Sequence, residues 1–232
     1  MEKIVILTGA GISAESGLGT FRDAGGIWSR YSIDEVATPQ AFARNPRVVS
    51  DFYNARRIQA RAARPNAAHI ALARLQQAHP AAVTIVTQNV DGLHEAAGAG
   101  EVIHMHGALD RALCLLCGHR WQAPDEMHPG DPCPACEAPG ARPDVVWFGE
   151  MPYRMDEIAE RLAAADLFVS IGTSGEVYPA AGFVQDAAQA GLRTLELNLE
   201  PSSGSRHFDA ARHGPATRIV PDWVDEVLAG GA

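Results

Sequence analysis

Residues 4–14 of the chain read Ile-Val-Ile-Leu-Thr-Gly-Ala-Gly-Ile-Ser-Ala. The apolar run Ile4–Leu7 is typical of a buried strand in a parallel sheet. A buried strand that leads through a glycine-rich turn into a helix is the phosphate-binding element of dinucleotide folds, because the helix N-terminus attracts an anion. The spacing Gly9-x-Gly11-x-x-Ala14 fits this element, although so short a pattern has low specificity. We therefore expect a nucleotide site where this strand ends.

Three further apolar runs have the length of buried strands, and helical patterns separate them. The strand-like runs are 83–87, 167–171 and 194–197, and the helical patterns lie near 45–62, 66–78, 155–164, 179–190 and 222–228. Alternating strands and helices predict an α/β fold, with a Rossmann-like parallel sheet covered by helices on both faces. A length of 232 residues with 47% hydrophobic residues suits one compact unit that carries a smaller insertion.

Polar or glycine-rich residues follow each predicted strand. These segments are Gly9-Ala10-Gly11, Gln88-Asn89-Val90-Asp91, Gly172-Thr173-Ser174 and Asn198-Leu199-Glu200. Ligands of parallel sheets bind beyond the carboxyl ends of the strands, so we expect these segments to form a single nucleotide cleft. The usual NAD fingerprint also has an acidic residue at the end of a second strand, about 20 residues further on. Here the chain continues instead into Phe21-Arg22-Asp23, which disfavours an ordinary dehydrogenase.

All four cysteines occur as two pairs, Cys114-x-x-Cys117 and Cys133-x-x-Cys136. Two such pairs can surround one tetrahedral metal ion, and this spacing is typical of a structural Zn²⁺ site without an open position for water. Two disulfides are the competing interpretation. They are disfavoured because we expect no secretory leader and because small oxidised domains usually carry more cysteine. We therefore expect one structural zinc ion, with the catalytic groups elsewhere.

Charge and hydropathy limit the partners of the protein. The net charge of -9 disfavours a nucleic-acid surface, which needs a basic field. We find no apolar run of the roughly 18 residues needed to span a bilayer, and the chain starts directly with a strand. We expect a cytoplasmic protein that binds neither nucleic acid nor membrane and is a monomer.

Three histidines near the predicted cleft are candidates for proton transfer, because an unperturbed imidazole has a pKa of about 6.5. They are His94, His104 and His106, and from the pattern alone any of them could instead be a packing residue. Asn89 could cap a helix, and Asp91 before Gly92 could form a turn. The residues alone therefore predict a nucleotide cleft with amide, carboxylate and imidazole groups, and no more.

Several motifs in order along the chain resemble the signature set of the sirtuin family. They are Gly9-Ala10-Gly11-Ile12-Ser13, Gly17 with Phe21-Arg22, residues 87–94 (TQNVDGLH), His106-Gly107, the four cysteines, residues 146–150 (VWFGE), Gly172-Thr173-Ser174 and Asn198-Leu199-Glu200. Together they extend from Ile4 to about Val220, nearly the whole chain. The chain is similar to the bacterial NAD-dependent protein-lysine deacylases of this family.

The resemblance implies a reaction with NAD as co-substrate and an acylated protein lysine as the other substrate. In sirtuins the acyl-amide oxygen attacks C1′ of the nicotinamide ribose and expels nicotinamide. A histidine then acts as general base on a ribose hydroxyl, and water finally releases free lysine and O-acyl-ADP-ribose. His106 matches that base by position. An imidazole suits this role because its pKa lies near the working pH.

The resemblance also implies which residues bind NAD. Gln88, Asn89 and Asp91 match residues that hold the nicotinamide ribose and carboxamide, and Ala10, Phe21 and Arg22 match the loop around the reactive sugar. The other expected NAD-binding residues are Gly9, Gly11, Ala14, Trp28, Gly172, Thr173, Ser174, Asn198, Leu199, Glu200 and Ala216.

The acyl group and the peptide have their own expected sites. Val145-Val146-Trp147-Phe148 matches an extended segment that pairs backbone to backbone with the substrate peptide. Tyr53 and Arg56 are three positions apart in a predicted helix and therefore share a face. Arg56 could belong to a solvated basic face with Arg57, Arg61 and Arg64. Tyr-x-x-Arg resembles, however, the pair that binds succinyl and malonyl carboxylates in one sirtuin class, so we favour that role.

We expect one catalytic unit over residues 1–232. Its predicted parts are a Rossmann-like domain (about 1–20, 66–107 and 147–232), a helical insertion (about 21–65) and a zinc-binding insertion (about 108–146). Two other functions remain open at this point. One is an NAD-linked oxidoreductase with a structural zinc, and the other is a zinc-ribbon interaction module.

Overall fold

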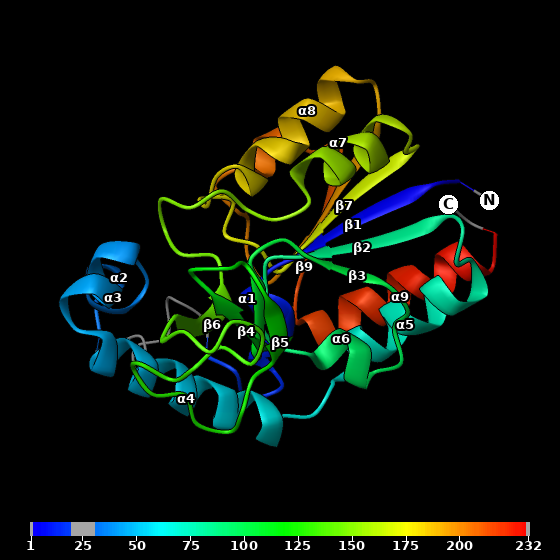
Figure 1. Ribbon diagram of the computed structural model, residues 1–232. Helices are drawn as coiled ribbons and strands as arrows, with labels where there is room; N and C mark the ends of the chain where they lie inside the picture. Colours follow the sequence, from blue (N-terminus) through cyan, green and yellow to red (C-terminus); the bar gives the residue numbers. More distant parts are fainter. Residues whose placement is uncertain (1, 20–30, 231–232) are drawn as a thin grey trace.

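A six-stranded parallel sheet is the centre of the computed structural model, which describes residues 2–19 and 31–230 (Figure 1). The strand order is β3-β2-β1-β7-β8-β9. The strands are β1 (Ile4–Thr8), β2 (Val83–Thr87), β3 (Val102–His104), β7 (Leu167–Ile171), β8 (Arg193–Asn198) and β9 (Ala210–His213). The predicted parallel sheet is confirmed. The edge strands were not predicted, because β3 has only three residues and β9 is exposed throughout, so neither forms an apolar run of the expected length.

Helices cover both faces of this sheet, as alternation along its strands requires. Ile4 and Ile6 of β1 belong to one buried cluster with α5 (Ala67–Ala78) and α9 (Ala216–Leu228). Val5 and Leu7 belong to a second cluster with α7 (Met155–Ala163) and α8 (Phe183–Gln189). Figure 1 shows the two layers on opposite sides of β1 and β2. Side chains that alternate along one strand thus hold the two helical layers together.

Most predicted helices occur close to their expected bounds. The pattern near 179–190 corresponds to a short 3₁₀ turn, η2 (Ala180–Gly182), followed by α8. The predicted start of the helix near 222–228 is wrong, because α9 begins six residues earlier, at Ala216, and contains Pro221. Proline removes one helical N–H and usually marks a helix boundary. Here the helix continues through it, since Val220 and Val224 are fully buried against the sheet layer.

A second, three-stranded antiparallel sheet lies beside the carboxyl end of the large sheet. Its order is β5 (Arg120–Gln122), β4 (Gly107–Cys114) and β6 (Ala141–Val145). The helices α2 (Ile33–Val36), α3 (Pro39–Arg44) and α4 (Pro46–Ala62) pack against it. The remaining elements are α1 (Ala10–Ala14), α6 (Leu93–Ala96) and the 3₁₀ turn η3 (Ser205–His207).

The side chain of Arg57 ties α4 to the cysteine-bearing segment. It is 1% exposed, and its guanidinium donates to the carbonyl oxygens of Leu109 (2.7 Å) and Asp125 (3.3 Å) and to the side chain of Asn54 (2.8 Å). Arg57 therefore does not lie on the solvated basic face that the sequence allowed. A buried guanidinium satisfied by carbonyl oxygens is a rigid link.

Among the described residues, the helices are all too short or too polar to cross a membrane.

Candidate active site at the carboxyl end of the sheet

The turns that follow β1 and β7 lie against each other without side chains between them. Gly11 donates its N–H to the carbonyl oxygen of Gly172 at 2.8 Å, and Gly172 has a φ of +63°. A Cβ on Gly11 would lie 2.7 Å from the Cα of Gly172, and one on Gly172 would lie 2.5 Å from the amide nitrogen of Ile12. Only glycine permits this approach. The exposed backbone fits the close contact that a pyrophosphate needs.

Asn89 and Asp91, which follow β2, are connected to α1 by hydrogen bonds. The amide of Asn89 donates to the carbonyl oxygen of Gly9 and to Ser13 Oγ, both at 3.1 Å. Ser13 Oγ in turn donates to Asp91 at 3.0 Å, and burial raises the pKa of the Asp91 carboxyl. The predicted cleft residues of β1 and β2 therefore lie together, as expected, and Ser13 links them.

Two buried histidines lie beneath this group. The rings of His69 and His94 are 5.0 Å apart, and their Nε2 atoms contact Ser13 Oγ (3.4 Å) and Thr8 Oγ1 (3.0 Å). Burial lowers the pKa of His69 to about 4 and that of His94 to about 3. Among the described residues, His94 Nδ1 is the buried side-chain nitrogen or oxygen that has no hydrogen-bond partner. A neutral, enclosed imidazole is a packing group, so His94 is a poor candidate for the base.

His104 is held by acceptors on both sides of its ring. Nδ1 lies 3.2 Å from the carbonyl oxygen of Asn89, and Nε2 lies 2.7 Å from a carboxylate oxygen of Glu95. Both partners only accept, so both ring nitrogens carry a proton. Burial lowers the pKa of His104, but the hydrogen bond and charge of Glu95 outweigh it and raise the pKa. A cationic ring with both nitrogens engaged cannot remove a proton from a substrate.

His106 differs from its neighbours in having one nitrogen fixed and the other unengaged. Nδ1 lies 3.1 Å from the carbonyl oxygen of Gln88, which can only accept, so Nδ1 carries the proton. Within the described part of the chain, Nε2 has no hydrogen-bond partner, so its lone pair is not used by the contact that Nδ1 makes with Gln88. Burial lowers the pKa of His106, so the ring is neutral at pH 7. Of the three candidate histidines, this is the one prepared to accept a proton.

The ends of β7 and β8 complete the edge of the sheet. The amide of Asn198 donates to the carbonyl oxygen of Thr173 at 2.8 Å, and Ser174 accepts from the N–H of Ser203 at 3.1 Å. Leu199 and Glu200 are exposed. Ala216 is the first residue of α9, whose second N–H, from Thr217, already binds Glu15. The residues expected to contact the nucleotide therefore lie on one edge of the large sheet, and Ala216 lies at the N-terminus of α9.

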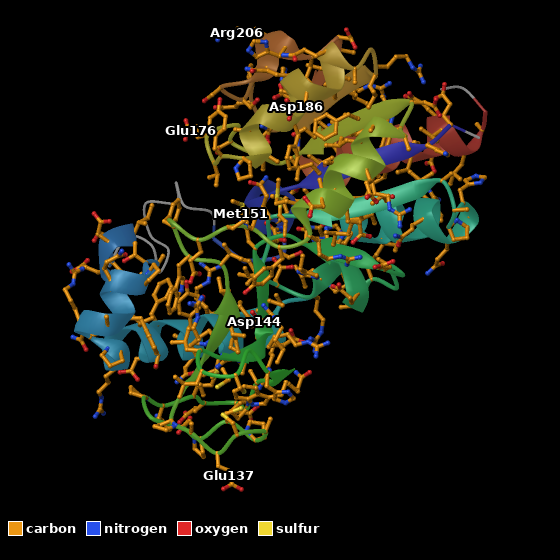
Figure 2. All side chains as sticks on the ribbon, turned by 45° about the horizontal axis from the view of Figure 1, so that its top comes forward. Glu137, Asp144, Met151, Glu176, Asp186 and Arg206 are labelled. Atoms are coloured by element: carbon orange, nitrogen blue, oxygen red, sulfur yellow. The ribbon has the colours of Figure 1, made fainter. Side chains whose placement is uncertain are left out.

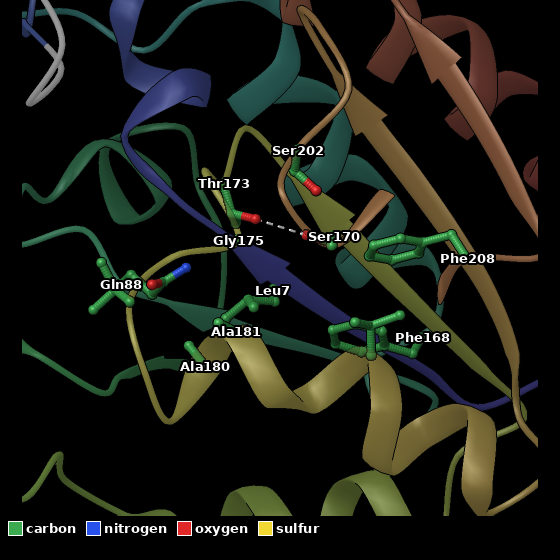
Figure 3. A pocket seen from close by; sticks show the side chains of 13 residues that line it. Leu7, Gln88, Phe168, Ser170, Thr173, Gly175, Ala180, Ala181, Ser202 and Phe208 are labelled. Atoms are coloured by element: carbon green, nitrogen blue, oxygen red, sulfur yellow. Dashed lines mark hydrogen bonds between the residues drawn. The ribbon is translucent and has the colours of Figure 1, made fainter. Parts of the chain in front are cut away.

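A pocket enters the protein beside these segments (Figure 3). It is a narrow pocket, partly open to solvent, between the strand ends and α8. Gln88 lies at one end and Phe168 and Phe208 at the other, with the Ser170–Thr173 hydrogen bond of 3.0 Å across it. Gln88 thus contributes its side chain to this pocket and its carbonyl oxygen to His106. The sequence predicted Gln88 and Thr173 here, but not the apolar wall.

Tyr53 and Arg56 lie on the inner side of α4. Tyr53 is 3% exposed, and burial raises the pKa of its phenol to about 12, so the hydroxyl stays protonated. Burial lowers the pKa of the Arg56 guanidinium, while Tyr53 and Asp91 are near enough to oppose that shift. Arg56 also lies over the ring of Phe52, 6.0 Å from its centroid. The pair therefore lies near Asp91, with Tyr53 buried and Arg56 half-buried.

The segment Val145–Phe148 is only partly an extended strand. β6 ends at Val145, and a turn follows. The N–H groups of Val146 and Phe148 donate to the carbonyl oxygens of His106 and Ala37, both at 2.9 Å, and that of Trp147 donates to Glu150 at 2.8 Å. These N–H groups are therefore occupied within the protein. A peptide that pairs with the segment has to donate to its carbonyl oxygens.

Sequence reasoning missed the ion pair that supports this segment. Arg142 is 2% exposed and binds Glu150 through two nitrogens, at 2.7 and 2.9 Å. Its guanidinium also lies 3.5 Å from the centroid of the Trp147 ring. Burial raises the pKa of Glu150, but the hydrogen bonds from Arg142 outweigh it and lower the pKa. Glu150 was part of the recognised motif, whereas nothing near Arg142 in the sequence marks it as buried.

The four cysteines form a cluster at the far end of the small sheet. Their sulfur atoms all lie within 4.8 Å of one another, with 3.8 Å between Cys114 and Cys136 and 3.7 Å between Cys117 and Cys133. A tetrahedron with Zn–S bonds of about 2.3 Å has edges of about 3.8 Å, so the sulfurs fit Zn²⁺. Disulfides would bring sulfurs to about 2.05 Å, which excludes that alternative. Figure 2 shows Glu137, the residue after Cys136, at the outer end of this segment, far from Arg206.

Three expected NAD-binding residues lie outside the described part of the chain. They are Phe21, Arg22 and Trp28.

Comparisons with known proteins agree over nearly the whole chain. A family model described as "Sir2 family" matches residues 9–179. An NAD-dependent protein deacylase of Caulobacter vibrioides is 56% identical over 231 residues, which cover 98% of this chain and 97% of that protein. An NAD-dependent protein deacylase of Escherichia coli (strain K12) is 51% identical, with coverage of 99% and 84%.

Solved structures share the fold over nearly the whole chain. A Sir2 homologue in complex with NAD superposes with a TM-score of 0.90 at 36% identity, covering 99% of this chain and 91% of that one. A Sir2 protein bound to an acetylated peptide superposes with a TM-score of 0.80 at 25% identity, covering 99% and 94%.

Proposed function

The chain belongs to the Sir2 family, and we propose that it is an NAD-dependent protein deacylase that uses His106 as general base. The products are free lysine, nicotinamide and O-acyl-ADP-ribose. The observation that carries the proposal is the hydrogen bond between His106 Nδ1 and the Gln88 carbonyl oxygen, because it leaves Nε2 able to accept a proton. The relatives named as deacylases, at 51% and 56% identity, support the reaction class.

NAD fits the edge of the large sheet as co-substrate. The glycine-rich turn after β1, which packs directly on Gly172, would bind the pyrophosphate with its backbone at the carboxyl edge of the sheet. Asn89 and Asp91 would hold the nicotinamide end, and Thr173, Ser174 and Asn198 the adenosine end. The complex of a Sir2 homologue with NAD supports this placement for a protein of the same fold. Phe21, Arg22 and Trp28 belong to the same proposal.

His106 would act after nicotinamide has left. A ribose hydroxyl then attacks the acyl carbon, which is bonded through its oxygen to C1′ as an imidate, and its proton passes to Nε2. The Gln88 carbonyl oxygen holds Nδ1–H, so the ring keeps its orientation and can bear the positive charge that follows. His104 is already protonated on both nitrogens and His94 is enclosed, so neither competes for this role.

We further propose that the acyl group lies against Tyr53 and Arg56. A guanidinium can bind a carboxylate through two parallel hydrogen bonds, and a protonated phenol adds a donor. The proposed substrates therefore include acetyl-lysine and also succinyl- and malonyl-lysine. The peptide backbone would pair with the segment Val145–Phe148 next to His106 through the carbonyl oxygens of Val146 and Phe148, because those of Val145 and Trp147 already accept from Arg142 and from the N–H of Glu150.

The cysteine cluster would hold one structural Zn²⁺, through Cys114, Cys117, Cys133 and Cys136. All four ligand positions are then filled by thiolates, so the metal stabilises the small sheet and takes no part in the chemistry.

One experiment tests the reaction. Acetyl- and succinyl-lysine peptides are incubated with the protein, with and without NAD, and followed by mass spectrometry. The proposal expects NAD-dependent loss of each acyl group, with one nicotinamide per deacylated peptide. Formation of NADH would indicate an oxidoreductase instead, and binding of peptide without either product would indicate an interaction module.

A further inference from the structure

One hydrogen bond joins the pair proposed to bind the acyl group to the segment proposed to bind the peptide. Nε1 of Trp147, in the segment after β6, lies 3.0 Å from the hydroxyl oxygen of Tyr53 on α4. Both side chains are buried, at 2% and 3% exposure, and their ring centroids are 6.3 Å apart. The two residues are 94 positions apart in the chain.

The direction of this hydrogen bond is fixed by chemistry. An indole N–H can only donate, so the Tyr53 oxygen must accept. Burial keeps the Tyr53 pKa at about 12, so the phenol also keeps its own proton. That proton cannot point at the Trp147 N–H, and the hydroxyl is therefore left to donate elsewhere. A carboxylate, which only accepts, is the group that such a donor binds best.

Trp147 itself is held rigidly from the other side. Its ring lies against the Arg142 guanidinium at 3.5 Å, and its backbone N–H donates to Glu150 at 2.8 Å. Arg142 and Glu150 are joined by the paired hydrogen bonds described above. Phe42 packs on the indole with ring centroids 5.2 Å apart. The indole N–H therefore has one available direction, toward Tyr53.

We infer that Trp147 is a positioning residue for acyl selectivity: its indole N–H orients the Tyr53 hydroxyl as a donor to the carboxylate of a succinyl or malonyl group. This inference rests on the proposed deacylase function. It adds a residue that does not touch the acyl carboxylate and acts through Tyr53. An acetyl group offers no carboxylate to that hydroxyl, so the effect of Trp147 should depend on the acyl group.

The test compares wild type, Trp147→Phe, Tyr53→Phe and the double variant. Phenylalanine keeps an aromatic ring on Arg142 but has no N–H. For each protein, kcat/KM is measured with a succinyl- and an acetyl-lysine peptide of the same sequence. Trp147 belongs to the peptide-binding segment, so both rates fall in Trp147→Phe. Dividing the succinyl value of kcat/KM by the acetyl value cancels this shared loss. The ratio therefore reports on recognition of the acyl group.

We expect Trp147→Phe to lower the succinyl-to-acetyl ratio by about three- to tenfold, the scale of one neutral hydrogen bond. In the Tyr53→Phe background there is no hydroxyl to orient, so the same substitution should leave the ratio unchanged. A merely structural role would lower both rates together in either background.

Three results would overturn the inference. An unchanged ratio in Trp147→Phe removes the role of the indole, and an equal fall of the ratio in both backgrounds shows that it does not act through Tyr53. A wild type that hydrolyses only acetyl peptide refutes the proposed carboxylate recognition as well, whereas the absence of any NAD-dependent turnover refutes the deacylase function itself. The wild-type rates alone distinguish the last two outcomes.

Discussion

The Nδ1 atom of His106 lies 3.1 Å from the carbonyl oxygen of Gln88, which fixes the proton of the imidazole on Nδ1 and leaves Nε2 as the acceptor. Gln88 follows β2 and also lines the pocket beside β7. The backbone carbonyl of Gln88, a residue of the proposed NAD-binding edge, therefore also orients the proposed base. The predictions below separate this arrangement from the parts of the protein that support it.

Arg56→Met should lower the succinyl-to-acetyl ratio of kcat/KM by about 10- to 100-fold, the scale of a charge-assisted hydrogen bond. Methionine keeps the length of the side chain but cannot bind a carboxylate. Tyr53→Phe should act in the same direction and more weakly, because it removes a neutral donor. The control is Arg61→Met on the same helix, whose side chain pairs with Asp125 at the surface. An equal fall of both rates in Arg56→Met would mean that Arg56 supports the helix or the NAD site.

Metal analysis should find about one zinc ion per chain, as a single site of four thiolates requires. Cys133→Ala should release the metal and lower the melting temperature, because the binding free energy of such a site is folding free energy. Leu116→Ser, at a position between Cys114 and Cys117 that is 68% exposed, should keep the metal and serves as the control. A metal-free protein that contains two disulfides would refute the zinc site.

Gly11→Ala should destabilise the protein by about 1–3 kcal/mol, the usual range for overpacking, and weaken NAD binding. The added Cβ would lie 2.7 Å from the Cα of Gly172, and neither backbone can move freely. Gly182→Ala is the matched control, since its nearest contact would be 3.7 Å away in a 3₁₀ turn. Urea unfolding and NAD titration measure the two effects. Equal stability of the two variants would show that the turns are not in close contact.

The free energy of unfolding should fall as the pH is lowered from 7 to 5. His69 and His94 have folded-state pKa values of about 4 and 3, below the ordinary 6.5, so between these values the unfolded chain binds more protons. His104 acts in the opposite direction, because its pKa is raised and the folded state binds its proton first. Burial also raises the pKa of Asp91, so this carboxyl acts in the same direction as His104. Burial lowers the pKa of His106 as well, so three lowered histidines oppose His104 and Asp91 and set the expected direction.

Urea midpoints at pH 5, 6 and 7 measure this effect, and His69→Asn should reduce the slope of stability against pH. A midpoint that rises toward pH 5 would show that the two buried imidazoles are not neutral in the folded protein.

Local patterns were enough to predict the elements that meet at the site. Ile4–Thr8 is a buried strand with glycines directly after it, and the cysteine spacing identifies its own cluster. The chemical difference between the three histidines needed the fold, since the acceptors for His104 and His106 come from Asn89, Glu95 and Gln88, and His94 is enclosed. The resemblance to sirtuins selected His106, and its role stays a prediction. The division into three domain parts and the monomeric state also stay predictions.

Long-range polar contacts could not be predicted from the sequence. Nothing in the chain connects Tyr53 with Trp147, or marks Arg57 and Arg142 as buried guanidinium groups. An arginine is ordinarily a surface residue, and its burial depends on carbonyl oxygens and carboxylates that only the folded chain brings together. The turn after Val145 has the same origin, because its N–H groups bind His106 and Ala37 from distant segments.

The most direct test of His106 as general base follows two products of His106→Ala in one reaction. The base is needed only after nicotinamide has left, so the variant should bind NAD and still exchange labelled nicotinamide into it in the presence of acyl peptide. Formation of O-acyl-ADP-ribose should fall roughly 100-fold or more, the usual scale for loss of a general base. Near-normal formation of O-acyl-ADP-ribose would contradict the assignment and turn attention to His94 and His104. Loss of exchange together with product would show that His106 positions NAD and is not the base.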